Sequence, residues 1–226
     1  MGQTKYMSLN IKTTKDLEEV AEFTANSINK QLELSKRVLW FVTGGSSIKV
    51  ESQIAPKINT NFPGRLVITL TDERFGDENH PDSNWYQLKQ LGFEIEKVKI
   101  INFLEGESFA DTVKRLRIVL KEELAKADYK IGNFGIGIDG HTAGILPHTD
   151  AVNSPELVCA YDTPQFDRIT ITPKVIRELD EAVVFAMGEN KWPILEKLGK
   201  EFPLEEDPSQ ILKSIPLLTI FTDKKV

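Results

Sequence analysis

Asp139 and His141 are the residues of this chain whose types and spacing best suit proton transfer. They are separated by one glycine within the segment 135–147 (GIGIDGHTAGILP). A carboxylate at this position can orient an imidazole, and an imidazole takes up and returns a proton near neutral pH. The segment therefore favours general acid–base chemistry on a tight glycine turn.

Two other kinds of site fit the same segment less well. Its glycine spacing matches a dinucleotide-binding turn, but residues 141–147 are too short and too limited by proline for the helix that follows such a turn. A metal site would draw on the nearby acids and histidines, Asp139, His141, His148 and Asp150. Their spacing matches no familiar ligand pattern, so we expect no metal ion here.

A second polar segment, residues 43–47 (TGGSS), follows an apolar run. Gly44 and Gly45 allow a tight turn whose N–H groups can bind a phosphate, and the hydroxyl of Ser46 adds a donor. The segment lacks the Gly-Lys-Ser/Thr ending of a triphosphate-binding loop. Taken alone, it is equally compatible with a phosphate site and with an ordinary turn between a strand and a helix.

A third polar segment, residues 71–75 (TDERF), also follows an apolar run. Asp72 and Arg74 would stand at the end of a strand, where functional side chains often gather. Taken alone, the segment is better explained as a solvated loop with a local Asp–Arg pair. Ser83 or Asn84, a little further on, can cap a helix over residues 85–91.

The elements that must position these segments alternate between strand-like and helix-like patterns. Strands are predicted at 38–42, 66–70, 98–104, 131–138, 157–161, 168–172, 182–187 and 217–222. Helices are predicted at 14–35, 85–91, 107–127, 173–179 and 190–200. The alternation predicts an α/β fold: a doubly wound, mostly parallel sheet with helices on both faces, in a single domain over residues 1–226. Ligands of such sheets bind at the carboxyl ends of the strands, which is where the three polar segments stand.

The composition limits the classes of partner. The 226 residues carry a net charge of −6, which argues against a nucleic-acid or anionic-membrane surface. No apolar run is long enough to span a membrane, and the first 20 residues lack the apolar core of a signal peptide. The single cysteine, Cys159, cannot form a disulfide within the chain, so we expect a cytoplasmic protein. The oligomeric state is not indicated.

Taken together, the polar segments resemble the 6-phosphogluconolactonase family, within the larger group that includes glucosamine-6-phosphate deaminase. Six segments match in order: Gly44-Gly45-Ser46; Asp72-Glu73-Arg74 with Asp82-Ser83-Asn84; 135–147; Arg168-Ile169-Thr170-Ile171-Thr172; Gly188-Glu189-Asn190-Lys191; and 208–223. Asp139-Gly140-His141-Thr142-Ala143 is specific, whereas Gly-Gly-Ser alone is not. Ser47-Ile48 and Gly76-Asp77 depart from the family's usual Thr-Pro and Val-Pro. The resemblance implies a Rossmann-like fold of the kind that the deaminases share.

The same turn separates the two activities of that group. In the deaminases the motif continues to a glutamate that helps the histidine to open the sugar ring. Here Leu146 occupies that position, and a leucine cannot relay a proton. The segment 139–147 is similar instead to the lactonase motif Asp-Gly-His-Thr-Ala-Ser-Leu-Phe-Pro.

The resemblance implies hydrolysis of 6-phospho-D-glucono-1,5-lactone to 6-phosphogluconate, a step of the oxidative pentose phosphate pathway, without a cofactor. His141 would activate the water, Asp139 would orient His141 or shape its turn, and N–H groups of the glycine turn would bind the oxyanion. Asp72 would bind sugar hydroxyls or share the proton transfer. The residues expected to bind the sugar phosphate are Gly44, Gly45, Ser46, Lys191, Arg74 and Arg168, with Lys191 the favoured cation.

Three alternatives remain at the level of sequence. The first is an enzyme of the glucosamine-6-phosphate deaminase/isomerase type, which Leu146 disfavours. The second is a non-catalytic sensor of sugar phosphates on the same fold, which would need the phosphate loop but not His141. The third is an α/β protein whose loops are only turns, and the agreement of six separate segments disfavours it.

Overall fold

The computed structural model describes residues 9–225, and its centre is one seven-stranded sheet. The strand order is β1-β10-β9-β6-β2-β3-β5, and every neighbouring pair is parallel. The strands are β1 (Asn10–Thr13), β2 (Val38–Val42), β3 (Leu66–Leu70), β5 (Lys99–Ile101), β6 (Tyr129–Gly135), β9 (Glu181–Phe185) and β10 (Leu217–Thr222). This sheet confirms the expected α/β class.

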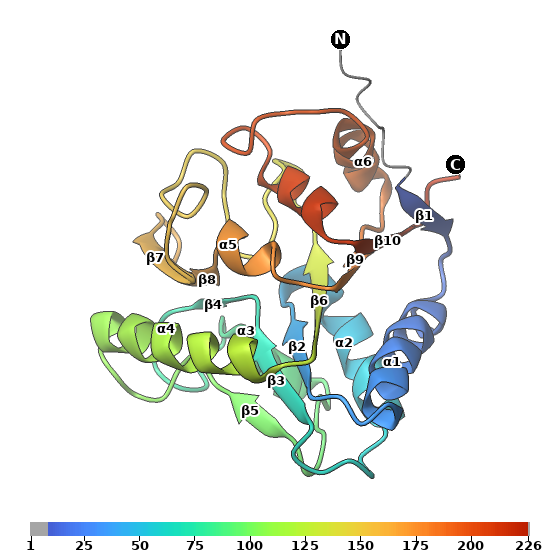
Figure 1. Cartoon of the computed structure of the whole chain (residues 1–226). Helices are drawn as coiled ribbons and strands as arrows, with labels where there is room; N and C mark the ends of the chain where they lie inside the picture. The colour runs from blue at the N-terminus through green and yellow to red at the C-terminus, as the bar shows by residue number, and fades with distance from the viewer. Residues whose placement is uncertain (1–8, 226) are drawn as a thin grey trace.

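Helices cover both faces of the sheet, as the sequence predicts (Figure 1). They are α1 (Leu17–Glu33), α2 (Ile48–Ile54), α3 (Asn84–Gln90), α4 (Phe109–Lys126), α5 (Pro173–Ile176) and α6 (Trp192–Leu198). The chain first runs from β1 through β2 and β3 to β5, and then returns through β6 and β9 to β10. Because parallel crossovers are right-handed, this reversal puts α1, α2 and α3 on one face and α4 on the other.

The central strands were predictable because they are apolar at almost every position. Each residue of β2 and of β3 is buried, since helices lie on both sides of these strands. The expected strand at 131–138 begins and ends earlier, at Tyr129 and Gly135. Residues 136–138 instead leave the sheet at its carboxyl edge and begin the turn that carries His141.

A second, antiparallel sheet stands beside the first and corrects one expectation (Figure 1). It has the order β4-β8-β7, formed by Asp72–Arg74, Asp167–Ile171 and Val158–Asp162. The segment 71–75 was expected to be a solvated loop, but it contains β4, whose Asp72 pairs with Thr170. Three consecutive charged or polar residues carry no strand pattern of their own. Here the strand forms because β8, almost 100 residues later, supplies its hydrogen-bond partners.

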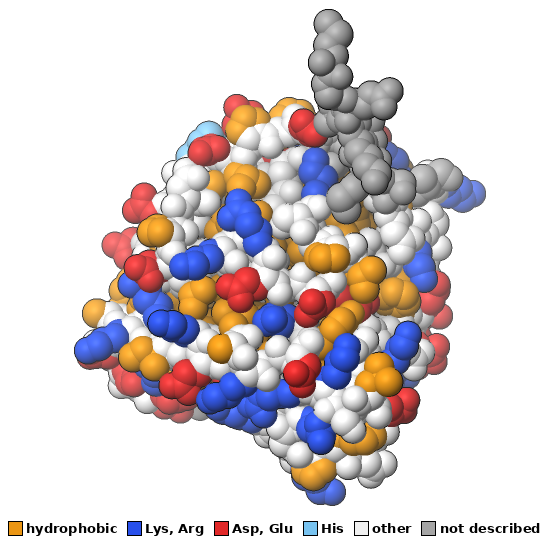
Figure 2. Space-filling model, in the orientation of Figure 1, with side chains coloured by type: hydrophobic (Ala, Val, Ile, Leu, Met, Phe, Trp, Pro, Cys, Tyr) orange, Lys and Arg blue, Asp and Glu red, His pale blue; other side chains and the backbone are white. Residues whose placement is uncertain are grey.

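Three further features concern the surface charges, the helices and the single cysteine. Acidic and basic side chains are interspersed on the face shown in Figure 2. Among the helices of residues 9–225, none is both long and apolar enough to cross a membrane. Cys159 is a free thiol that lies buried in β7. Of the first 20 residues, in which no signal peptide was expected, the first eight lie outside the described part.

Candidate active site

A pocket opens where the chain reverses direction across the sheet. β2 and β6 are neighbours in the sheet, but the chain leaves β2 toward β3 and leaves β6 toward β9, on opposite sides. The two departing loops part at the carboxyl edge of the sheet and leave a crevice between them, which is where open α/β sheets bind ligands. The pocket holds about 230 Å³ and lies between these loops and the small sheet.

The pocket brings together segments that are far apart in the sequence. Its lining residues are Thr43, Gly44, Gly45, Ser46, Asp72, Arg74, Asn84, Gly135, Ile136, Gly137, His141, Ala143, Arg168 and Lys191. Every site residue expected from the sequence is in this list except Asp139, which contacts His141 instead. Asn84 was expected only as a helix cap, but Ser83 caps α3 and the Asn84 amide donates to the Asp72 carbonyl.

Asp139 and His141 form a direct pair at the mouth of the pocket. His141 Nδ1 lies 2.6 Å from Asp139 Oδ1, and the side chains are 39% and 48% exposed. The hydrogen bond from the imidazole lowers the pKa of Asp139 to about 2, so this carboxylate keeps its charge at any working pH. A charged Asp139 holds the proton of His141 on Nδ1. The other ring nitrogen, Nε2, is then left with a lone pair that can accept a proton.

The turn that carries this pair is closed by its own backbone. Gly137 N–H donates to the His141 carbonyl at 2.8 Å, and Gly140 N–H donates to the Gly137 carbonyl at 3.0 Å. N–H groups of the glycine turn were expected to bind an oxyanion, but those of Gly137 and Gly140 are engaged in shaping the turn. From outside, Ser209 N–H donates to the Gly140 carbonyl at 2.8 Å, so the segment that begins η4 (Pro208–Ser214) braces the turn.

The loop of residues 43–47 passes close to α3. A Cβ added to Gly44 would lie 2.0 Å from Asn84 Oδ1, so only glycine fits at this point. Behind the loop, the Thr43 N–H donates to Oε1 of Glu51, a fully buried side chain of α2. The loop therefore presents Gly44, Gly45 and Ser46 to the pocket while its first residue is tied to the helix beneath it.

Lys191 reaches the pocket from the segment that follows β9, whereas the loop of residues 43–47 follows β2. It ends the short turn η3 (Glu189–Lys191), and its ammonium donates to the Ile136 carbonyl at 2.6 Å. Partial burial lowers the pKa of Lys191, while the charge of Asp139 acts in the opposite direction. Within residues 9–225 no carboxylate forms an ion pair with Lys191, so its charge is available to an anion in the pocket.

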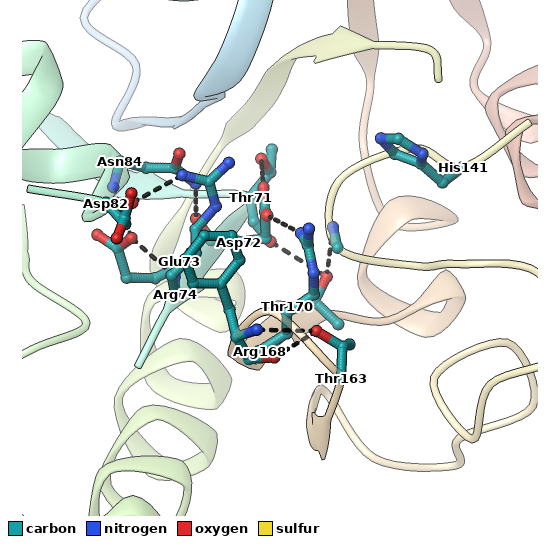
Figure 3. Close-up of polar contacts among 12 residues, drawn as sticks. Thr71, Asp72, Glu73, Arg74, Asp82, Asn84, His141, Thr163, Arg168 and Thr170 are labelled. Carbon is teal, nitrogen blue, oxygen red and sulfur yellow. Dashed lines mark hydrogen bonds and ion pairs between the residues drawn. The ribbon is translucent and has the colours of Figure 1, made fainter. Parts of the chain in front are cut away.

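The small sheet contributes two arginines and an aspartate (Figure 3). Asp72 was expected to pair locally with Arg74, but its partner is Arg168 of β8, with Oδ2 and Nη1 3.5 Å apart. Arg74 instead donates to the Asp82 carbonyl at 2.7 Å, and its guanidinium lies over the ring of Phe166. His141 stands apart from this group, on its own loop.

Glu73, between two lining residues, has a structural task that sequence reasoning missed. It is fully buried and accepts hydrogen bonds from Ser83 Oγ and from the N–H groups of Arg74, Asn84 and Trp85. Burial raises the pKa of Glu73, and these four donors counteract that effect. Glu73 thereby joins β4 to the start of α3. Nothing in the local sequence distinguishes it from an exposed glutamate.

The pocket combines one acid–base pair with a concentration of N–H donors and cations. The four possible metal ligands, Asp139, His141, His148 and Asp150, do not come together in one group. Among the described residues, no group of three or more histidine, cysteine, aspartate or glutamate side chains is placed to hold a metal ion. The arrangement suits an anionic small molecule that reacts by proton transfer.

Comparison with known protein sequences gives a consistent set of relatives. The 6-phosphogluconolactonase of Chlamydia trachomatis is 25% identical over 151 residues, which cover 62% of this chain and 58% of that protein. The 6-phosphogluconolactonase of Haemophilus influenzae is 26% identical over 168 residues, which cover 70% of this chain and 71% of that protein. The chain thus spans less than two thirds of the chlamydial relative.

Solved structures show the same fold. A 6-phosphogluconolactonase from Thermotoga maritima has a TM-score of 0.83 at 19% identity, covering 96% of this chain and 100% of that one. One from Shewanella baltica has a TM-score of 0.82 at 18% identity, covering 98% and 100%. A family model described as glucosamine-6-phosphate isomerases/6-phosphogluconolactonase matches residues 12–219. Because this match covers most of the sequence, the chain belongs to the glucosamine-6-phosphate isomerase/6-phosphogluconolactonase family.

Proposed function

We propose that this protein hydrolyses 6-phospho-D-glucono-1,5-lactone to 6-phosphogluconate, the lactonase step of the oxidative pentose phosphate pathway. The observation that carries the proposal is the pairing of His141 with Asp139 beside a pocket that is also lined by Gly44, Gly45, Ser46 and Lys191. The relatives named 6-phosphogluconolactonase support it, as does Leu146 at the position where the deaminases have a glutamate.

His141 acts as the general base and then as the general acid. Its Nε2 takes a proton from a water molecule whose oxygen forms a bond to the lactone carbonyl carbon. The bond between that carbon and the ring oxygen then breaks, and the imidazolium returns the proton to the ring oxygen. Asp139 holds the Nδ1 proton throughout and stabilises the imidazolium. No metal or organic cofactor takes part.

The phosphate binds to the loop of residues 43–47 and to the cations around it. Gly44, Gly45 and Ser46 supply donors. Lys191 supplies a charge that no carboxylate of the described chain neutralises by an ion pair. Arg168 and Arg74 assist from the small sheet. Asp72 is already paired with Arg168, which favours a role in binding sugar hydroxyls and orienting that arginine over a role in proton transfer.

The partner of this site is a small sugar phosphate, and the net charge of −6 offers no surface for nucleic acid. We place the reaction in the cytoplasm, because the one cysteine is a free, buried thiol, as suits a reducing compartment.

The test is to supply both candidate substrates to the purified protein. The lactone is generated in place from glucose 6-phosphate, and the formation of 6-phosphogluconate is compared with the spontaneous rate without protein. We expect hydrolysis well above that rate and no ammonia from glucosamine 6-phosphate. Ammonia release would make the protein a deaminase. Binding of 6-phosphogluconate without any hydrolysis would make it a sugar-phosphate sensor.

A further inference from the structure

Glu51 is a buried acid placed directly behind the loop of residues 43–47. Its side chain is 0% exposed, and its Oε1 accepts a hydrogen bond from the Thr43 N–H at 3.1 Å. The other oxygen, Oε2, is buried and has no hydrogen-bond partner within residues 9–225. Glu51 takes no part in the proton transfers assigned to His141. An acid so poorly satisfied inside a protein calls for a reason of its own.

No charged side chain in the elements that contact α2 most extensively compensates a charge on Glu51. Its helix, α2, packs against α1, α3, η1 (Gly45–Ser47) and η2 (Ala55–Lys57). The buried side chains of α1 and α3 are all non-ionisable: Val20, Ala21, Thr24, Ala25, Ile28, Leu32, Asn84, Trp85 and Leu88. η1 contains only glycine and serine, and Lys57 of η2 pairs with the exposed Glu18. Burial raises the pKa of Glu51 to about 8, so the carboxyl is uncharged at neutral pH.

We propose that Glu51 is a positioning residue that must be uncharged for the loop of residues 43–47 to bind a phosphate. The neutral carboxyl holds the Thr43 N–H and thereby fixes the start of the loop. An ionised carboxylate would place a negative charge behind the N–H groups of Gly44 and Gly45, in surroundings of low polarity where charges interact strongly. That charge would repel the anion. The inference rests on the proposed function, which assigns the phosphate to this loop.

Binding of an anion to the loop and ionisation of Glu51 should oppose each other. If ionised Glu51 weakens anion binding, then a bound anion must raise the pKa of Glu51 by the same free energy. The affinity should therefore fall by up to about tenfold for each pH unit above the pKa of the free protein. Glu51→Gln keeps an oxygen that accepts from Thr43 but has no proton to lose. Titration of Lys191 affects both proteins alike, so the difference between them reports on Glu51.

The first experiment needs no ligand. The amide nitrogen and proton chemical shifts of Thr43, Gly44 and Gly45 are followed by NMR from about pH 6 to about pH 10. In the wild type these shifts should change with a midpoint near pH 8, and in Glu51→Gln that change should be absent. Glu181→Gln is the matched control, because Glu181 is buried at the start of β9, where Tyr129 donates to it. In Glu181→Gln the chemical shifts of these amides should change with pH as they do in the wild type.

The second experiment measures proton uptake on binding. 6-Phosphogluconate and, separately, inorganic phosphate are titrated into the protein by calorimetry near pH 8, in two buffers that differ in ionisation enthalpy. The wild type and Glu181→Gln should take up protons with either ligand, whereas Glu51→Gln should take up markedly fewer.

The results that would contradict these expectations have different consequences for Glu51 and for the proposed function. Equal proton uptake by the wild type and Glu51→Gln, or loop amides that titrate in both, would overturn the role of Glu51. Coupled binding of inorganic phosphate with no binding of 6-phosphogluconate would support that role and overturn the proposed function. Binding of neither anion would overturn both.

Discussion

At the scale of single residues, phosphate binding should depend on which cations of the pocket already have a partner within the protein. Arg168 is paired with Asp72, and Arg74 is held by a backbone carbonyl on one side and by Phe166 on the other. Among residues 9–225, Lys191 is held by the Ile136 carbonyl alone, which orients the ammonium without cancelling its charge. The phosphate of the substrate should therefore owe more of its binding to Lys191 than to either arginine.

Lys191→Met should consequently raise KM for the lactone by about 10-fold to 100-fold with little change in kcat. The lost contact holds a phosphate remote from the reacting carbon, so it contributes about equally to the ground state and the transition state. Lys200→Met, an exposed lysine after α6, is the control and should leave both constants unchanged. An unchanged KM in Lys191→Met would assign the phosphate to other residues.

At the scale of elements, the turn that carries Asp139 and His141 is held by a segment from the far end of the chain. Gly140 has a φ of +89°, and a Cβ there would lie 2.7 Å from Oδ1 of the buried Asp207. Asp207 is itself fixed by hydrogen bonds from Ser209 and Gln210. The contact is therefore tight and cannot relax by rotating an exposed side chain.

Gly140→Ala should destabilise the protein by about 2–4 kcal/mol, the sum of a strained backbone and an overpacked contact. The free energy of unfolding is measured by urea denaturation. Gly64→Ala is the matched control: its φ is +75°, but nothing lies within 4 Å of the added Cβ. It should lose only the backbone part, about 1–2 kcal/mol. Equal losses in the two variants would show that Asp207 does not restrict the turn.

The same elements show how far sequence reasoning reaches. β2 and β3 were predictable because strands buried on both faces must be apolar throughout, and the glycine-rich segments after strands identified the loops of the pocket. β4 was not, because Asp72–Arg74 becomes a strand only through pairing with β8. The expected pairing of Asp72 with Arg74 was wrong for the same reason, because its actual partner, Arg168, lies in β8. The sequence faintly indicated that Glu51 is buried, because Glu51 shares a helical face with Ile54. Nothing in the sequence indicated that Glu73 is buried.

At the scale of the whole molecule, both ends of the described chain lie in one sheet. β1 pairs with β10 along residues 10–13 and 219–222, so the first and last strands are neighbours. The small sheet is joined to the large one at β4, which directly follows β3, and supplies Asp72, Arg74 and Arg168 to the pocket. We propose that residues 1–226 form a single domain whose two sheets unfold together.

The two sheets carry separate probes of this proposal. Cys159, the only cysteine, is buried in β7 of the small sheet, and far-UV circular dichroism reports mainly on the larger remainder. Labelling of the thiol and loss of dichroism should have the same midpoint in urea. Reactivity of Cys159 at a lower urea concentration than the loss of dichroism would show that the small sheet opens as an independent unit.

The central claim is that His141 is the proton carrier of a lactonase, and its most direct test is hydrolysis of 6-phospho-D-glucono-1,5-lactone by His141→Ala beside the wild type. Binding of 6-phosphogluconate is measured on both proteins to show that the pocket is intact. We predict that kcat falls by about a hundredfold to ten-thousandfold while the affinity for 6-phosphogluconate changes little. A variant that binds 6-phosphogluconate and still hydrolyses the lactone at the wild-type rate would contradict the account.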